Sequence, residues 1–198
     1  MKILILETST EKGCLILAED ENIIEALPLS GGPELSKRLG IETQSLLKRR
    51  RFSPEWIAVG TGPGSYTGIR VGAALAKSLS YGWQIPLLGF CSLKAFTSPV
   101  EGAFAILVDA RSAGFYALFG EKKGTDYLFK EPSLLSPNDP ALQSVAYIAS
   151  PHPTAIQKRG SFPPILETSP DPQLLAHIVY QQYLTEGAAP LQLNYGSP

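Results

Sequence analysis

The chain has 198 residues, with 17 Lys and Arg against 18 Asp and Glu, which gives a formal net charge of −1 at pH 7. This length allows one large domain or two small lobes with buried cores. The balanced charge excludes a bulk basic field that would hold nucleic acid by counterion release, so any bound RNA would need charge from another chain. Cys14 and Cys91 lie in apolar stretches, which favours buried thiols in a reducing cytoplasm over a disulfide framework.

The apolar runs predict a cytoplasmic protein without membrane contact. The first run ends at Glu7, and it is shorter than the roughly 7–15 apolar residues of a signal-peptide core. No other run approaches the ~20 apolar residues that are needed to cross a membrane.

The first hundred residues predict a three-stranded antiparallel meander that continues into alternating helices and strands. β-Branched and leucine-rich runs are separated by short polar turns, a pattern typical of hairpins. An amphipathic stretch with cations at its end predicts the first helix, and a glycine-rich loop leads into the second. The predicted strands cover 2–8, 13–18, 22–29, 56–62 and 85–90, and the predicted helices cover 33–50 and the later part of 60–80.

The same pattern restarts at Glu101. The sequence at 103–123 resembles the sequence at 1–21, with Asp109 in the position of Glu7, and such a repeat indicates duplication. We therefore predict an α/β fold with two RNase H-like lobes, at 1–100 and 101–198, in the two-lobed architecture of actin, Hsp70 and the sugar kinases (the ASKHA fold). The second lobe is short. Its predicted elements are strands at 126–131 and 145–150, helices at 136–144 and 170–187, and an irregular proline-rich segment at 150–172.

The sequence predicts neither a metal site nor a serine-hydrolase site. The two histidines, His152 and His177, lack the i, i+4 spacing of a helical zinc site, and the cysteines have no ligand spacing. Ser65 lies in PGSYTG rather than in the Gly-x-Ser-x-Gly motif of a nucleophile elbow.

Glu7 and Asp109 each end the first strand of their half, which is where this superfamily places acids that hold Mg²⁺ through water. The turn after Glu7 lacks an early glycine that would admit a phosphate, and Arg111 stands in the second turn. Two interpretations stay open. The favoured one is that the acids satisfy backbone donors at strand ends, and the other is that Glu7, Asp109 and Arg111 lie near a nucleotide.

The glycine-rich loop GTGPGSYTGIR fits neither common phosphate motif. A Walker-A loop needs Lys followed by Ser or Thr after its last glycine, whereas Ile69 and Arg70 follow Gly68 here. Pro63 also removes one of the amides that would bind phosphate.

Small residues recur every four positions in the helix after this loop, at Gly68, Gly72, Ala76 and Ser80. They form one ridge with almost no side chains. Glycine costs about 1 kcal/mol relative to alanine in a helix, so close packing must offset that cost at Gly72. The ridge could pack on the chain's own sheet or against another protein, and the spacing alone does not decide between them.

At this point the sequence resembles the bacterial TsaB family, also called YeaZ. The segments that carry the resemblance are KILILETST, AVGTGPGSYTGIRVGAALAKSLSYGWQIPLLGFCSL and ILVDARSAGFYALF, of which GPGSYTGIRVG is the most specific. The resemblance covers residues 1–120 clearly. It implies the two-lobed actin-like fold. It also implies that the chain is a degenerate relative of the TsaD subunit. TsaD itself forms N6-threonylcarbamoyladenosine at adenosine 37 of tRNAs that read ANN codons.

The resemblance further implies a non-catalytic partner of a TsaD-like subunit, in a complex that includes a TsaE-like ATPase. Such a chain would meet tRNA only through the complex and bind no cofactor alone, with ATP or ADP at the boundary between subunits. A homodimer through the same face is a further expectation. The implied partner-facing residues are Gly62, Pro63, Gly64, Ser65, Tyr66, Thr67, Gly68, Arg70, Gly72 and Ala76.

The sequence departs from the pattern of the catalytic relatives at the metal site. Ser92 and Phe96 stand where TsaD-type proteins have a metal-binding His-x-x-x-His pair, so a peptidase or metalloenzyme is not expected. The acid usual near Gly114 is missing, and Glu7 replaces the family's usual Asp. The alternative function is an ATP-dependent phosphotransferase of the acetate- or sugar-kinase type, which would use Glu7 and Asp109 around Mg²⁺.

Overall fold

The computed structural model describes residues 1–187 and forms two compact units. The first unit contains residues 1–95 and the returning segment from residue 170. Its sheet has the order β3-β2-β1-β4-β5, in which β1, β2 and β3 are antiparallel and β1, β4 and β5 are parallel. The strands are β1 (Lys2–Glu7), β2 (Lys12–Glu19), β3 (Asn22–Ser30), β4 (Trp56–Gly60) and β5 (Leu87–Phe90).

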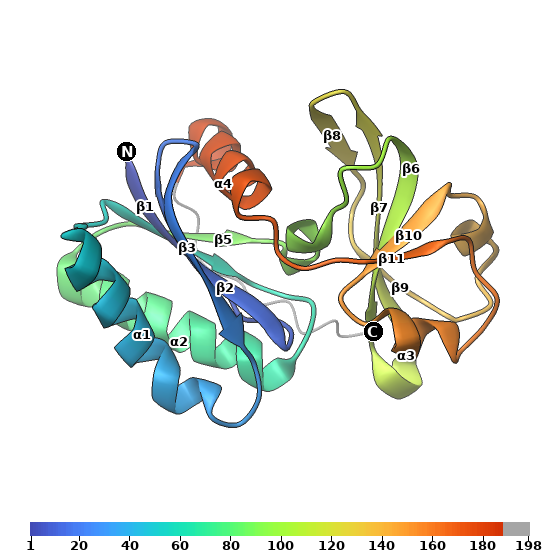
Figure 1. The fold of residues 1–198 in the computed structure, drawn as a ribbon, viewed down its shortest axis with the longest axis horizontal. Coiled ribbons are helices and arrows are strands. Elements are labelled where there is room, and N and C mark those ends of the chain that lie inside the picture. The colour runs from blue at the N-terminus through green and yellow to red at the C-terminus, as the bar shows by residue number, and fades with distance from the viewer. Residues whose placement is uncertain (188–198) are drawn as a thin grey trace. The chain divides into compact units, whose positions relative to one another are not determined.

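Helices cover both faces of this sheet (Figure 1). Helices α1 (Leu35–Arg50) and α2 (Tyr66–Trp83) lie on one face, and α4 (Pro172–Glu186) lies on the other, against β2 and β3. The core under α1 and α2 is aliphatic, because alternate side chains of the buried strands meet the apolar stripes of both helices. A short 3₁₀ helix, η1 (Ser92–Phe96), follows β5.

The second unit contains residues 96–169 of the described chain. Its sheet has the order β11-β10-β6-β7-β8, and β9 pairs with β7. The α-helix described in this unit, α3, has only five residues. The elements are β6 (Gly102–Asp109), η2 (Arg111–Ala113), β7 (Phe115–Lys123), β8 (Asp126–Phe129), β9 (Ser133–Leu135), η3 (Pro140–Gln143), β10 (Tyr147–Ser150), α3 (Pro153–Gln157) and β11 (Ile165–Glu167).

The predicted α/β fold with two meander-based sheets is confirmed, and the second unit repeats the start of the first. The predicted helix at 136–144 is wrong, because only the 3₁₀ turn η3 forms there. The segment at 150–172 contains α3 and β11 rather than irregular chain. Residues 188–198 of the predicted second lobe lie outside the described residues.

Helix α4 joins the first unit rather than the second half of the chain in which the sequence places it. Trp56 and Tyr183 meet edge to face, with ring centroids 4.2 Å apart. The Nε2 amide of Gln182 donates to the carbonyl of Gly89 at 3.1 Å. Sequence periodicity predicts that a helix forms, but it does not say which sheet the helix covers. In the described part of the chain, no helix is long and apolar enough to span a membrane.

Candidate functional site

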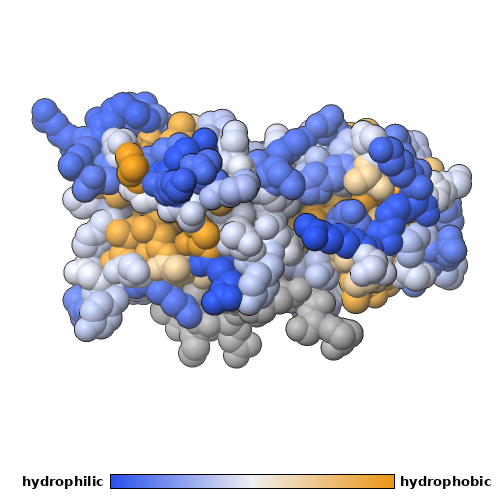
Figure 2. All heavy atoms as spheres, turned by 90° about the horizontal axis from the view of Figure 1, so that it is seen from below, coloured by the Kyte–Doolittle hydropathy of each residue, from blue (hydrophilic) through white to orange (hydrophobic). Residues whose placement is uncertain are grey.

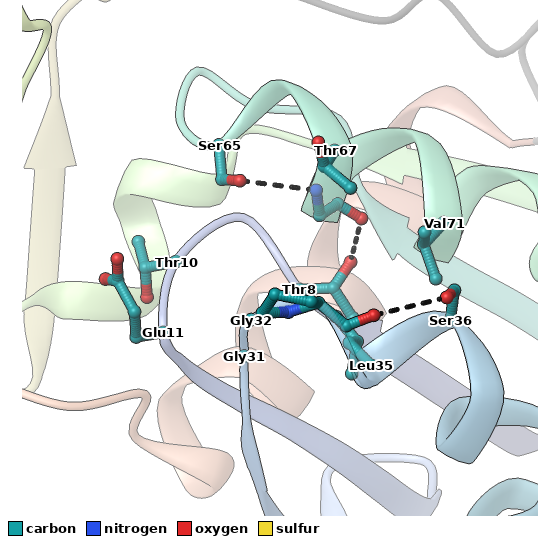
Figure 3. Close-up of a pocket in the computed structure, with 12 residues that line it drawn as sticks. Thr8, Thr10, Glu11, Gly31, Gly32, Leu35, Ser36, Ser65, Thr67 and Val71 are labelled. Atoms are coloured by element: carbon teal, nitrogen blue, oxygen red, sulfur yellow. Dashed lines mark hydrogen bonds between the residues drawn. The ribbon is translucent and has the colours of Figure 1, made fainter.

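The glycine-rich loop between β4 and α2 lies against the β1–β2 turn, and a pocket of about 350 Å³ opens beside them (Figure 3). The turn contributes Thr8, Thr10 and Glu11 to this pocket, the segment before α1 contributes Gly31 and Gly32, and the start of α2 contributes Ser65 and Thr67. The pocket therefore collects hydroxyl groups near the N-termini of α1 and α2.

The hydroxyl groups of Thr8 and Ser65 at this pocket are engaged in structural hydrogen bonds. Thr8 Oγ1 donates to the carbonyl of Gly68 at 2.9 Å, and Ser65 Oγ caps α2 by accepting from the Gly68 amide at 3.3 Å. The Ser65 amide donates to the carbonyl of Ser9 at 2.6 Å. These bonds hold the start of α2 on the β1–β2 turn, so the loop acts as a structural connection.

The ridge of small residues on α2 faces the chain's own β1–β2 turn. Gly68, Gly72 and Ala76 are buried. A Cβ atom added to Gly68 would overlap the carbonyl of Thr8, and one added to Gly72 would overlap Thr8 Oγ1. The prediction that this ridge meets a partner therefore needs correction, because Thr8 already occupies the space. Gly62 and Pro63, joined by a cis peptide bond, are buried as well.

The other predicted interface residues remain accessible. Ser65, Tyr66, Thr67 and Arg70 are exposed on the first turns of α2, and Gly64 is half-buried. The Arg70 guanidinium stacks over the Tyr66 ring, 5.1 Å from its centroid. This part of the predicted set stays a prediction for partner contact.

Glu7 is sealed inside the first unit. Its side chain is fully buried, and Oε1 accepts from the Ser9 amide at 2.6 Å. Oε2 has no hydrogen-bond partner among the described residues and faces Gly60 and Ser92. Burial raises the pKa of Glu7, although hydrogen bonds from Ser9 oppose that shift. A buried carboxyl that favours its neutral form is a poor ligand for Mg²⁺, which needs oxygen donors with accessible charge.

Asp109 is paired with an arginine that the sequence analysis did not single out. Arg159 forms a salt bridge with Asp109 and also donates to the carbonyl of Gly114 at 2.8 Å. The Asp109 carboxylate accepts from the amide of Arg111 at 3.0 Å, and Arg111 itself is in the left-handed region with φ 56°. Glu7 and Asp109 thus have different surroundings despite their matching places in the repeat. Arg159 lies in the stretch predicted to be irregular, where no pattern marked it.

The region that corresponds to the missing histidine pair has a structural role. Ser92 Oγ accepts from the Gly62 amide at 3.0 Å, and Phe96 is fully buried. His177 lies beside Glu21, with 3.2 Å between Nδ1 and Oε1. Within residues 1–187, no three His, Cys, Asp or Glu side chains gather in a way that could hold a metal ion.

The two-sheet architecture belongs to the actin-like class of two-lobed α/β proteins, whose lobes each start from a three-stranded meander. A family model for TsaD, tRNA N6-adenosine threonylcarbamoyltransferase, matches residues 27–163. The chain therefore belongs to this family, and its relatives within the family are proteins of the TsaB (YeaZ) type.

Two curated relatives are named tRNA threonylcarbamoyladenosine biosynthesis protein TsaB. The one from Bacillus subtilis is 33% identical over 132 residues, which is 63% of this chain and 57% of the relative. The one from Escherichia coli is 31% identical over 124 residues, which is 59% of this chain and 53% of the relative. The matched part of the chain thus spans about half the length of these relatives.

Two solved structures share the fold. YeaZ from Pseudomonas aeruginosa superimposes with a TM-score of 0.77 at 21% identity, over 94% of each chain. An uncharacterized protein described as similar to the peptidase YeaZ from Pseudomonas aeruginosa gives 0.78 at 21% identity, over 97% of this chain and 99% of that one. At this identity the match establishes the fold only.

Proposed function

We propose that this chain is a non-catalytic subunit that binds a TsaD-like subunit, with a TsaE-like ATPase, to form N6-threonylcarbamoyladenosine at adenosine 37 of ANN-decoding tRNAs. Membership of the TsaD family and the names of the TsaB relatives support the pathway. The observation that carries the partner role is the outer surface of α1 and α2, which combines apolar and exposed side chains.

Apolar side chains continue from the core to the surface between these two helices. Leu47 of α1 and Val71, Leu75 and Leu79 of α2 pack against the core but stay partly exposed. Ile41 of α1 is 67% exposed. Figure 2 looks at the α1–α2 side of this unit and shows hydrophobic residues gathered in one area. Apolar side chains that gather on an exposed face mark protein interaction sites.

The surroundings of the two strand-end acids support a non-catalytic role. Glu7 is buried away from any ligand, and Asp109 is engaged by Arg159. Neither acid is free to hold a magnesium ion for phosphoryl transfer. A nucleotide would then bind at the boundary with the TsaD-like subunit rather than on this chain alone, and the protein would act in the cytoplasm.

Substitution of Ala74 by arginine tests the partner role. Ala74 is exposed on the outer side of α2, between Arg70 and Ser78 on the same helix. Arginine is a good helix former, so the free energy of unfolding of the isolated variant should lie within about 0.5 kcal/mol of the wild-type value. The long charged side chain should prevent close approach of another subunit. We expect affinity-tagged Ala74→Arg to lose the TsaD-like subunit in pull-downs from cytosol that retain it with wild type.

The matched control is Thr125→Arg, which adds the same side chain at an exposed turn of the second unit. It should retain the partner. Size-exclusion chromatography with light scattering, done on both variants, separates loss of a homodimer from loss of the TsaD-like subunit. Equal capture of the partner by wild type and Ala74→Arg would refute docking on this surface.

Removal of the protein should also abolish the modified adenosine in total tRNA, measured by mass spectrometry of nucleosides.

A further inference from the structure

A groove of about 610 Å³ lies at the C-terminal ends of α1 and α2, beside the segments that lead into β4 and β5. Leu47, Phe52 and Ile85 supply its apolar surface, and Trp83 forms one side. Trp83 is 43% exposed, although it is the largest side chain at the groove. None of the residues that line the groove is acidic. It is separate from the pocket at the opposite ends of the two helices.

Cations at the groove are not neutralised. The chain has four consecutive basic residues at 48–51, and they divide into two pairs. Arg49 and Arg50 both form salt bridges with Glu25. Lys48 and Arg51 line the groove, are exposed, and form no salt bridge with an acid among residues 1–187. The local positive charge is therefore concentrated beside the exposed indole, even though the chain as a whole is nearly neutral.

The backbone at the helix ends adds a second observation. Both helices end in a left-handed residue that is not glycine, Arg51 at φ 49° and Gln84 at φ 55°. Glycine is the usual residue at such positions, because a side chain there costs roughly 1–2 kcal/mol. The helix dipole favours a cation near a C-terminus, but it does not require the cation at the strained position itself. Arg51 therefore presents its side chain at the groove at this conformational cost.

We propose that this groove binds a single-stranded segment of RNA, with a base stacked on Trp83 and phosphates held by Lys48 and Arg51. A nucleotide combines a flat base, which can stack on an indole, with a phosphate, which can pair with cations. The groove has both an exposed indole and, among residues 1–187, unpaired cations. An acidic peptide would satisfy the cations but has no matching flat ring for the indole. The inference goes beyond the partner role proposed above and gives this chain its own contact with RNA.

Two double variants with the same change in net charge test the proposal. Lys48→Gln with Arg51→Gln removes the groove cations, whereas Arg49→Gln with Arg50→Gln removes the neighbours that pair with Glu25. The probe is a fluorescein-labelled oligoadenylate of about 12 nucleotides, a length within the site sizes of single-strand binders, and binding is followed by anisotropy against salt concentration. Loss of two phosphate contacts should lower the slope of log affinity against log salt by about 1.4. The control variant should keep the wild-type slope and affinity.

Stacking is tested separately with Trp83→Ala. The affinity for the oligonucleotide should fall about 5- to 150-fold, the range for loss of one stacked aromatic residue. Binding should also quench tryptophan fluorescence in the wild type, and the quenching should disappear in the variant, which retains Trp56. Circular dichroism melts of every variant check that the fold is intact, since all four charge positions are exposed.

Three results would overturn the proposal: an unchanged salt slope in Lys48→Gln/Arg51→Gln, wild-type affinity in Trp83→Ala, or equal competition by polyglutamate without quenching. The last result would instead assign the groove to an acidic polypeptide. The groove variants should still capture the TsaD-like subunit, and Ala74→Arg should still bind the oligonucleotide. Failure of the RNA contact and failure of the partner role can therefore be told apart.

Discussion

Replacement of Gly72 by alanine tests whether the small-residue ridge of α2 is filled by the chain's own turn. In the structure, an added Cβ overlaps Thr8 Oγ1 and lies 3.5 Å from Thr8 Cβ. Gly40 of α1 provides the matched control, because it is also inside a helix but a Cβ added there meets nothing within 4 Å. The two substitutions make the same chemical change in opposite surroundings.

The two substitutions should change the free energy of unfolding in opposite directions. Alanine gains about 1 kcal/mol over glycine in a helix, so Gly40→Ala should be stabilised by up to that amount. At Gly72 the same gain is offset by overpacking, which costs about 1–3 kcal/mol. Movement of Thr8 would also weaken its buried hydrogen bond to Gly68, worth about 1 kcal/mol. The net expectation for Gly72→Ala is a destabilisation of about 1–3 kcal/mol.

Urea denaturation of the two single variants measures this difference, and a double-mutant cycle identifies its cause. Thr8→Ala removes Oγ1, so that Gly72→Ala in this background meets only the ordinary contact at 3.5 Å to the Cβ of residue 8. Gly72→Ala should then become neutral or stabilising. If Gly72→Ala stabilises the wild-type chain as much as Gly40→Ala does, the ridge is open, and the assignment of Thr8 as its cover is refuted.

Two further predictions concern the buried carboxyl of Glu7. Burial raises the pKa of the folded Glu7 carboxyl above 4.5, so in the pH range between the two values the folded chain keeps a proton that the unfolded chain releases. The contribution of Glu7 to the free energy of unfolding is therefore complete below pH 4.5. It falls as the pH rises towards the folded pKa, by at most about 1.4 kcal/mol per pH unit. Urea denaturation at a series of pH values from 4.5 upwards should show this fall in the wild type but not in Glu7→Gln, and parallel pH profiles would contradict it. Gly60→Ala should lower the free energy of unfolding by about 1–3 kcal/mol, because its Cβ would overlap the Glu7 carboxyl and lie 2.5 Å from Ser92 Oγ. Thermal melts equal to those of the wild type would disprove this packing.

The regular elements of the first unit could be predicted because each shows its own period. Strands such as β1 and β2 are continuous apolar runs, and α1 has an apolar stripe that ends in cations. The short elements of the second unit were less accessible. Residues 136–144 and 150–172 contain many prolines, and proline marks where chains turn without saying whether a 3₁₀ turn, a short helix or a short strand follows.

The sequence by itself determined the class of fold, the repeat of the meander, and the family to which GPGSYTGIRVG pointed. Only the tertiary structure decided what the glycine ridge packs against, because a row of small residues permits close approach by any backbone, and Thr8 is distant in sequence but adjacent in space. The same applies to charge. A run of four basic residues looks uniform in the sequence, yet the fold brings Glu25 to Arg49 and Arg50 while it leaves Lys48 and Arg51 beside Trp83. Local patterns record which surface a residue can occupy, whereas its partner depends on which distant segment the fold brings into contact.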